Sequence, residues 1–236
     1  TAATIVSGAM AERTQFKSYI AYSVVISAFI YPVVVRWQWG GGWLYQLSTP
    51  FHDFAGSSIV HMTGGIASFA GARALGARIG KYGENGKVNV IAGHSLPFVI
   101  TGCFILLVGW FGFNAGSNLE ANGLAALAFI NTFVATAAAA VAWALVEQIH
   151  HGRPSLLGAV TGAVAGLVAI TPASGFAAPM TSILIGLFVS PVCYLFVAVV
   201  KNKLNSVHKM LRQQMNESSL QLQFLLLHIV PNCHEK

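Results

Sequence analysis

The sequence predicts an all-α protein that crosses a membrane several times, and three observations support this fold class. Hydrophobic residues make up 55% of the 236 residues and charged residues only 8%, whereas an average soluble domain carries about 25% charged residues. Long windows contain no Asp, Glu, Lys or Arg, and Lys and Arg gather in alternate connections between these windows. So few charges cannot cover a water-soluble surface, which excludes soluble enzymes. The formal charge of +6 is scattered and forms no phosphate-binding stripe, so no nucleic-acid partner is expected.

Charge-free windows locate the spans, because a bilayer core about 30 Å thick needs about 20 apolar residues in a helix. The longest window, 154–200, is long enough for two spans and is interrupted by the turn sequence TPASG at 171–175. The first residues are apolar up to Glu12 and are expected to be the end of an earlier span, so that the chain is a fragment. We predict six complete helices, at 16–36, 54–74, 94–116, 121–147, 155–171 and 178–200.

The basic residues give these spans a direction across the membrane. Nine Lys and Arg residues lie in one set of alternate connections, and Arg36 alone lies in the other set. Because Lys and Arg are enriched in cytoplasmic loops, we expect the connection at 73–87 to be cytoplasmic. The other set should then face outside, namely 36–53, 117–120 and 171–177. This alternation predicts a multi-pass integral membrane protein.

Small residues recur at helical spacing in the later spans. Gly158, Gly162 and Gly166 are four residues apart, and 135–142 reads ATAAAAVA. Faces of small residues allow helix backbones to approach closely inside a membrane. We therefore expect these positions to serve helix packing in a tight bundle.

Two polar side chains at the start of the second predicted span and within it are candidates for function, because polar groups at membrane depth are costly. Asp53 opens the segment DFAGSSIVHMTGG at 53–65 and is the only Asp of the chain. It is expected to cap the helix by accepting backbone N–H groups, a role compatible with shaping the field at a pore mouth. His61 follows about 12 Å further along the helix. Composition alone supports a core residue and a pathway residue equally.

Motifs for enzyme or metal chemistry are missing from the sequence. Glu147 and His150 form an E-x-x-H pair, but a di-metal site needs a second such pair and two further carboxylates. This pair is expected to be solvated at a cytoplasmic helix end. There is also no G-x-S-x-G motif, P-loop or H-E-x-x-H motif. We therefore predict no enzyme, no catalytic residue, no metal and no cofactor.

Aromatic residues gather toward the predicted outer side. The sequence GWFGFNAGS at 109–117 ends one span there, and three Trp residues flank the glycines at 40–42, namely Trp37, Trp39 and Trp43. An aromatic belt at the membrane interface accounts for the Trp residues but accounts less well for Phe111 and Phe113. Aromatic faces beside a hydroxyl can bind a small hydrated cation through cation–π attraction.

Several long segments closely resemble the ammonium transporter family, which is related to the Rhesus glycoproteins. They are DFAGSSIVHMTGG, GWFGFNAGSNLEANGLAALAFINTFVATAAAA (109–140) and GRPSLLGAVTGAVAGLVAITPASGF (152–176), and AMAERTQFKSY (9–19) fits as well. The resemblance implies a bundle of eleven helices built from two inverted five-helix repeats and a last helix. The chain would be a fragment that carries the third to ninth helices. The full parent would be a homotrimer in the plasma (cell) membrane.

The resemblance also implies roles for five residues and a mechanism. Trp39 and Ser117 would capture ammonium at the outer mouth, Phe113 would be one of two stacked gates, and His61 would be the first of two pore histidines. Asp53 would support the capture site. Ammonium would lose its proton after capture, and ammonia would pass a narrow apolar pore, because desolvating an intact cation is costly. Potassium ions, which carry no proton, would be excluded.

The chain departs from the family pattern near its end. We assign 1–203 to a partial ammonium transporter membrane domain and 204–236 to an unrelated polar tail, disordered or artefactual. The family's second pore histidine, in an H-G-x-G-G-like motif, and its other gate Phe have no counterpart here. The chain as given is therefore expected not to support ammonium uptake by itself. Two alternatives stay open: a non-conducting truncated subunit or sensor of the same family, and a channel for another small neutral solute.

Overall fold

A computed structural model describes residues 1–81, 89 and 91–200, and these residues form helices and loops without a β-strand. The chain divides into two compact units, Thr1–Pro191 and Val192–Lys236. In the second unit, the described residues complete helix α8 and form the π-helix η4 (Phe196–Val200). The all-α class is confirmed. The predicted tail at 204–236, the division at 203 and part of the 73–87 connection lie outside the described residues.

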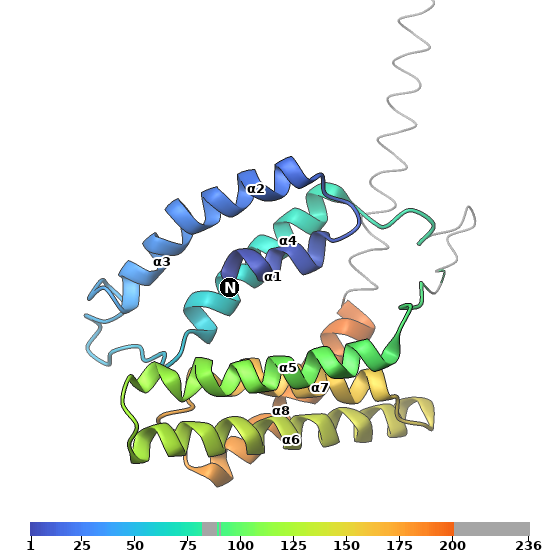
Figure 1. Ribbon diagram of the computed structural model, residues 1–236. Helices are drawn as coiled ribbons and strands as arrows, with labels where there is room; N and C mark the ends of the chain where they lie inside the picture. The colour runs from blue at the N-terminus through green and yellow to red at the C-terminus, as the bar shows by residue number, and fades with distance from the viewer. Residues whose placement is uncertain (82–88, 90, 201–236) are drawn as a thin grey trace, which may run out of the picture. The chain divides into compact units, whose positions relative to one another are not determined.

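The first half of the larger unit is built from helical segments that contain π-helical turns. They are α1 (Ala2–Met10), α2 (Phe16–Val25), η1 (Ile26–Ile30), α3 (Tyr31–Gln38), η2 (Ser57–Met62) and α4 (Thr63–Leu75). The segments α2, η1 and α3 run on without a break, as do η2 and α4, so that each group forms one long helix (Figure 1). Helix α1 packs along α4, where a β-carbon added at Gly64 would lie 2.9 Å from the carbonyl oxygen of Ala2.

The second half packs α6 tightly against α7. Its helices are α5 (Leu96–Asn114), the short η3 (Gly116–Asn118), α6 (Gly123–His151), α7 (Leu156–Ile170) and α8 (Pro179–Leu195). A β-carbon at Gly162 would lie 2.6 Å from the carbonyl oxygen of Ala139, and one at Gly166 would lie 2.7 Å from that of Ala135. The small residues are therefore required for helix packing, as the sequence predicted.

Helical segments lie at all six predicted spans, and four of them are long and apolar enough to cross a membrane. These four are Phe16–Gln38, Leu96–Asn118, Gly123–His151 and Pro179–Ala198. The helix at Leu156–Ile170 has 15 residues, which extend about 22 Å at 1.5 Å per residue. This length falls short of a bilayer core about 30 Å thick. Its glycines and the turn at 171–175 suit it to contact with other helices.

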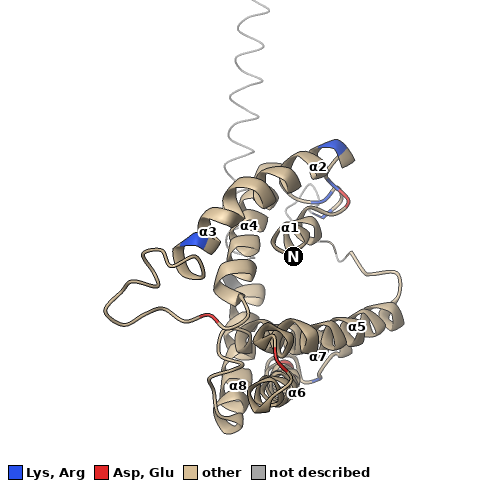
Figure 2. Cartoon of the chain, turned by 60° about the vertical axis from the view of Figure 1, so that its left-hand side comes forward, with Lys and Arg blue, Asp and Glu red and all other residues tan. Residues whose placement is uncertain are grey.

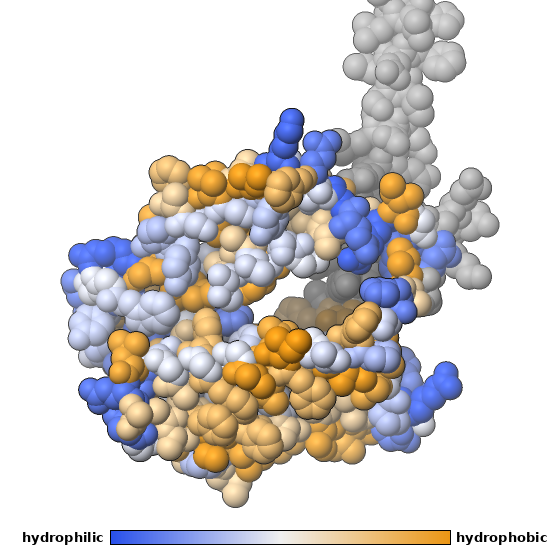
Figure 3. Space-filling model, viewed as in Figure 1, coloured by the Kyte–Doolittle hydropathy of each residue, from blue (hydrophilic) through white to orange (hydrophobic). Residues whose placement is uncertain are grey.

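Charged side chains keep to the helix ends and connections. Lys, Arg, Asp and Glu are found near the ends of helices and in loops, and the helix bodies are free of them (Figure 2). Apolar side chains cover the middle of the face formed by α5 and α6, and hydrophilic groups gather at both ends (Figure 3). Such a surface matches a bilayer, in which the hydrocarbon region is bounded on both sides by water.

One apolar cluster joins the first helices to the centre of the molecule. Its buried members come from α1, η1 and η2, and Phe113 of α5 packs against it. The buried residues are Ala2, Val6, Met10, Ile26 and Val60. Because Val60 precedes His61 on η2, this cluster fixes the part of the chain that carries the candidate pore residue.

Candidate functional site

Asp53 makes the capping hydrogen bonds that the sequence favoured. Its side chain is buried, with 3% of its surface exposed. One carboxylate oxygen, Oδ1, accepts the backbone N–H groups of Gly56 at 2.7 Å and Ser57 at 3.2 Å. The other, Oδ2, accepts those of Ser58 at 2.8 Å and Ile59 at 3.1 Å. The carboxylate thus satisfies the four free amides at the start of η2 and places negative charge at the positive end of the helix.

Trp39 is tied directly to this cap. Its indole Nε1–H donates to the carbonyl oxygen of Asp53 at 2.9 Å. Gly56 has a φ of 109°, which disfavours any side chain there. A β-carbon at Gly56 would also lie 2.9 Å from Cη2 of Trp39. The indole therefore lies against the start of η2, with 43% of its surface exposed.

His61 lies inside a π-helical turn, a wide turn that often marks a functional position. Its backbone N–H donates at 3.3 Å to the carbonyl oxygen of Gly56, five residues earlier. The hydroxyl of Thr63 donates at 2.6 Å to the carbonyl oxygen of Ile59, within the same widened stretch. The imidazole is 9% exposed, and its Nδ1 atom has no hydrogen-bond partner within the described part of the chain.

Two aromatic rings of α5 enclose the imidazole. The Trp110 ring centroid lies 5.0 Å from that of His61 at an interplanar angle of 32°. The Phe113 centroid lies 5.6 Å away at 81°, an edge-to-face contact. The two α5 rings are themselves 5.8 Å apart. The structure thus brings together His61 and Phe113, two of the residues selected from the sequence, and adds Trp110 to them.

Sequence reasoning missed Trp110 and its partner Thr171. The indole Nε1–H of Trp110 donates at 2.8 Å to the hydroxyl oxygen of Thr171, which lies just after the end of α7. The two residues are 61 positions apart, so no local pattern links them. The available signal was the spacing of Trp110 and Phe113, which places both rings on one face of a helix.

The other candidates at the predicted outer side have separate partners. Ser117 lies in η3, is exposed, and donates its hydroxyl to the carbonyl oxygen of Phe113 at 2.7 Å. No hydrogen bond or ring contact among the described residues joins Ser117 to Trp39. Phe111 stacks on Phe129 of α6 at a centroid distance of 4.0 Å and is a packing residue. Trp39 and Asp53 therefore form one hydrogen-bonded pair, and Ser117 and Phe113 form a separate one.

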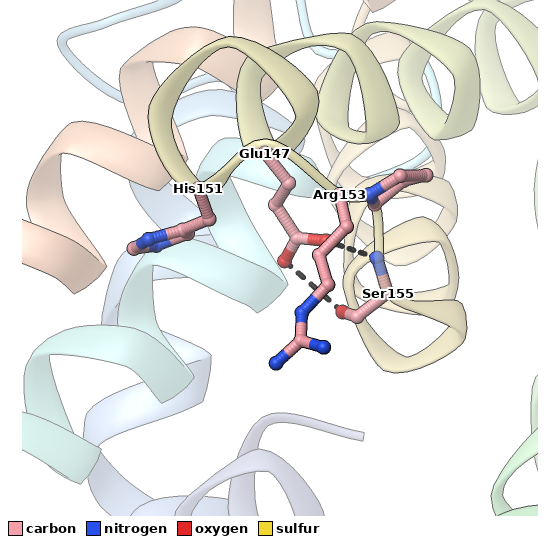
Figure 4. Close-up of a pocket in the computed structure, with 5 residues that line it drawn as sticks. Glu147, His151, Arg153 and Ser155 are labelled. Atoms are coloured by element: carbon pink, nitrogen blue, oxygen red, sulfur yellow. Dashed lines mark hydrogen bonds between the residues drawn. The ribbon is translucent and has the colours of Figure 1, made fainter.

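Glu147 lies near the C-terminal end of α6. The sequence predicts only that it is solvated, but its carboxylate makes specific hydrogen bonds. Its carboxylate accepts the backbone N–H of Ser155 at 2.6 Å and the Ser155 hydroxyl at 3.1 Å (Figure 4). It also accepts the indole N–H of Trp143 at 3.2 Å. Glu147 thus holds α6 to the first turn of α7. A cavity of about 420 Å³ lies here, lined by Glu147, His151, Arg153, Pro154 and Ser155.

No group of three or more His, Cys, Asp or Glu side chains that could hold a metal ion occurs within residues 1–81 and 91–198. The described polar groups instead hold helix ends and aromatic rings in place. Apolar helices that enclose a buried histidine between aromatic rings define the class of the molecule. It is a multi-pass integral membrane protein with a polar site inside its helical bundle.

The chain belongs to the Ammonium Transporter Family, which residues 1–209 match. It is 44% identical over 199 residues to an ammonium transporter of Bacillus subtilis, an alignment that covers 84% of this chain and 47% of the relative. It is 46% identical over 195 residues to ammonium transporter Amt2 of Archaeoglobus fulgidus, covering 79% of this chain and 42% of the relative. The chain therefore spans about half the length of these relatives.

Solved structures show the same fold. A structure described as a sensor Amt protein matches with a TM-score of 0.78 and 38% identity, covering 83% of this chain and 50% of that one. Mep2 of Candida albicans matches with a TM-score of 0.75 and 33% identity, covering 83% of this chain and 43% of that one. In both matches this chain corresponds to half or less of a longer chain.

Proposed function

We propose that the chain forms part of a protein that moves ammonium or ammonia across a membrane. The observation that carries the proposal is the environment of His61 in a member of this family. Its imidazole is buried among aromatic rings, and its Nδ1 atom has no hydrogen-bond partner among the described residues. Such a nitrogen can exchange a hydrogen bond with a small neutral molecule that has left its water shell.

Capture of the cation is assigned to the outer side, at Trp39. The exposed indole face can attract a cation, and cation–π attraction contributes about 0.5–2 kcal/mol, depending on how far the cation is desolvated. The bond from the indole to the carbonyl oxygen of Asp53 holds this face in place. The Asp53 carboxylate adds negative charge, although its own hydrogen bonds are all directed at η2. The exposed hydroxyl of Ser117 is the second proposed capture group.

Loss of a proton, which passes to water on the capture side, is assigned to the step between capture and the His61 site. Phe113 packs against the apolar cluster and contacts the imidazole edge to face, and we assign it the role of a gate. An intact ammonium ion that passed this ring would lose its hydration without gaining a charged partner, which is costly. Ammonia avoids this cost because it is neutral. The same argument disfavours potassium ions, which have no proton to release.

The membrane and the assembly follow from the same proposal. Large apolar side chains are exposed along α2, α5 and α6 and require lipid or other protein surfaces to cover them. We assign the protein to the plasma membrane and to a homotrimer, as the family resemblance implies.

A sensor that binds ammonium without conducting it is the second candidate. It is favoured by the description of one similar solved structure as a sensor Amt protein. The two candidates share the outer capture site and differ in flux.

The test is flux through the complete gene product, purified and reconstituted into liposomes that contain a pH-sensitive dye. We expect an ammonium gradient to change the internal pH, and Trp39→Leu to raise the half-saturating concentration about 2- to 30-fold. His61→Ala should abolish or alter flux at every concentration. Trp43→Leu is the matched control, because Trp43 is an exposed tryptophan of the same loop. Unchanged kinetics in both the Trp39 and His61 variants would refute the pore assignment, and binding without flux would favour the sensor.

A further inference from the structure

Two hydrogen bonds tie the end of α7 to the segment that carries Asp53. The backbone N–H of Phe54 donates at 3.0 Å to the carbonyl oxygen of Pro172. The hydroxyl of Ser57 donates at 2.7 Å to the carbonyl oxygen of Val168, which lies in the last turn of α7. Ser57 and Val168 are 111 positions apart, so these two bonds form a clasp between distant parts of the chain.

A proline explains why the carbonyl oxygen of Val168 can accept this bond. In a regular α-helix that oxygen would accept the N–H four residues later, at position 172. Pro172 has no N–H, although Thr171 before it keeps helical φ and ψ angles of −51° and −45°. The Ser57 hydroxyl therefore replaces a hydrogen bond that α7 cannot make for itself.

The turn at 171–177 also packs directly on Phe54. The rings of Phe54 and Phe176 meet edge to face with 5.5 Å between centroids. A β-carbon at Gly175 would overlap the Phe54 ring, so the turn can approach this closely only with glycine there. On the α6 side, the buried side-chain amide of Asn131 donates to two carbonyl oxygens of the turn, at 2.8 and 2.7 Å. The turn is thus a support fixed by α6 as well as by α7.

The peptide group between Asp53 and Phe54 connects this support to Trp39. Its N–H is the group that donates to Pro172. Its carbonyl oxygen accepts the indole N–H of Trp39 at 2.9 Å. Because a peptide group is planar, the bond to the turn sets the direction of the carbonyl that holds the indole. The backbone N–H of Ser57 donates to the Asp53 carboxylate at 3.2 Å, so the cap and the clasp share this segment.

We propose that Ser57 is a positioning residue for ammonium capture, which acts by holding the turn at 171–177 against the peptide group that orients Trp39. The inference rests on the proposed function, because capture is assigned there to Trp39. Ser57 acts through Trp39 and is not placed in contact with the cation. The apolar cluster that includes Val60 holds the neighbouring His61 independently of the clasp. Opening the clasp should therefore weaken capture and leave the maximal flux unchanged.

Three substitutions at two serines test this in the complete gene product, reconstituted into liposomes. Ser57→Ala removes the donor and should raise the half-saturating ammonium concentration about 2- to 10-fold, the effect of one net hydrogen bond. Ser57→Thr keeps a hydroxyl and should restore the wild-type value. Ser190→Ala is the matched control and should leave that value unchanged. It also removes a serine hydroxyl bonded to a carbonyl oxygen of another helix, that of Ala139 at 2.6 Å.

A double variant separates positioning from stability. Ser57→Ala alone leaves the Val168 carbonyl without its donor and should lower the unfolding temperature. Adding Pro172→Ala supplies an N–H within α7, so the unfolding temperature should rise again while the half-saturating concentration stays raised. Recovery of both quantities together would show that Ser57 serves stability alone, and the inference would be overturned.

The indole ¹⁵N NMR signal of Trp39 gives a readout that does not depend on transport. This signal, assigned by its loss in Trp39→Leu, should shift in Ser57→Ala and keep its wild-type position in Ser57→Thr and Ser190→Ala. An unshifted signal or an unchanged half-saturating concentration in Ser57→Ala would overturn the inference, as would an equal change in Ser190→Ala. If the wild-type protein neither bound nor moved ammonium, the proposed function would fail, and the Trp39 signal would still decide whether the clasp positions the indole.

Discussion

Replacing Asp53 by Ala should destabilise the protein more than loss of an ordinary helix cap. The carboxylate accepts four backbone N–H groups, two on each oxygen, at distances from 2.7 to 3.2 Å. Ala has no acceptor, so all four amides would lose their partner. Those of Gly56 and Ile59 are bonded in buried surroundings, where water cannot replace the lost oxygen.

The size of the effect follows from these two buried amides. Leaving one buried donor unsatisfied costs about 1–3 kcal/mol, so Asp53→Ala should lower the free energy of unfolding by about 2–6 kcal/mol. Asp53→Asn keeps one oxygen and turns an NH₂ group toward the other pair of amides. It should therefore lose about half as much, about 1–3 kcal/mol, rather than preserve the cap in full.

Thermal unfolding of the purified protein in mild detergent, followed by circular dichroism, ranks the variants. Ser95→Ala is the control, because Ser95 caps α5 through one exposed bond of 3.5 Å, and its loss should cost about 0.5 kcal/mol. If Asp53→Ala were no less stable than Ser95→Ala, the carboxylate would not hold η2 as argued. Transport by Asp53→Asn near the wild-type level, with a large loss in Asp53→Ala, would assign the importance of Asp53 to capping rather than to charge.

The remaining predictions concern packing and topology. Gly162→Ala should destabilise the protein by about 1–3 kcal/mol, because the added β-carbon would overlap α6. Gly112→Ala is the control and should not destabilise, because a β-carbon there has no atom within 4 Å. Equal unfolding temperatures of the two variants would contradict the packing argument. Glu147→Ala should lower stability by about 0.5–1.5 kcal/mol in the same assay, because the amide and hydroxyl at the start of α7 lose their acceptor but are exposed to water, and a neutral effect would count against the contact. Single cysteines at Ser48 and Gly83, in a background without the native cysteines, should react with an impermeant reagent from outside and from inside respectively; labelling of Gly83 from outside would reverse the topology.

The sequence predicted the helices well because their signals are local. Helical segments lie at all six positions that the charge-free windows indicated, four of them long enough to span a membrane, and the turn at 171–175 separates α7 from α8 where expected. The glycines of α7 were correctly assigned to packing, because spacing by four residues is a property of one helix. The cap by Asp53 was also predictable, since acceptor and amides lie within six residues of one another.

Contacts between residues far apart in the chain could not be predicted from the sequence. Nothing near Trp110 in the sequence points to Thr171, and the link between them exists only once α5 and α7 pack together. Glu147 was expected to meet solvent, because its partner Ser155 becomes available only when the chain reverses after α6. The π-helical form of η2 was likewise not predicted, because the hydrophobic pattern of one wide turn differs too little from that of an α-helix.

The π-helical turn at η2 has a consequence for how this segment can evolve. A π-turn amounts to one extra residue inserted into an α-helix. Deleting a single residue within η2 would turn this stretch α-helical and leave α4 in its present register. A deletion in α4 itself, which has no extra residue to lose, would rotate everything beyond it by about 100° and present a different face to α1. The residue count of η2 can therefore change by one without moving α4, whereas the residue count of α4 is fixed by its packing on α1.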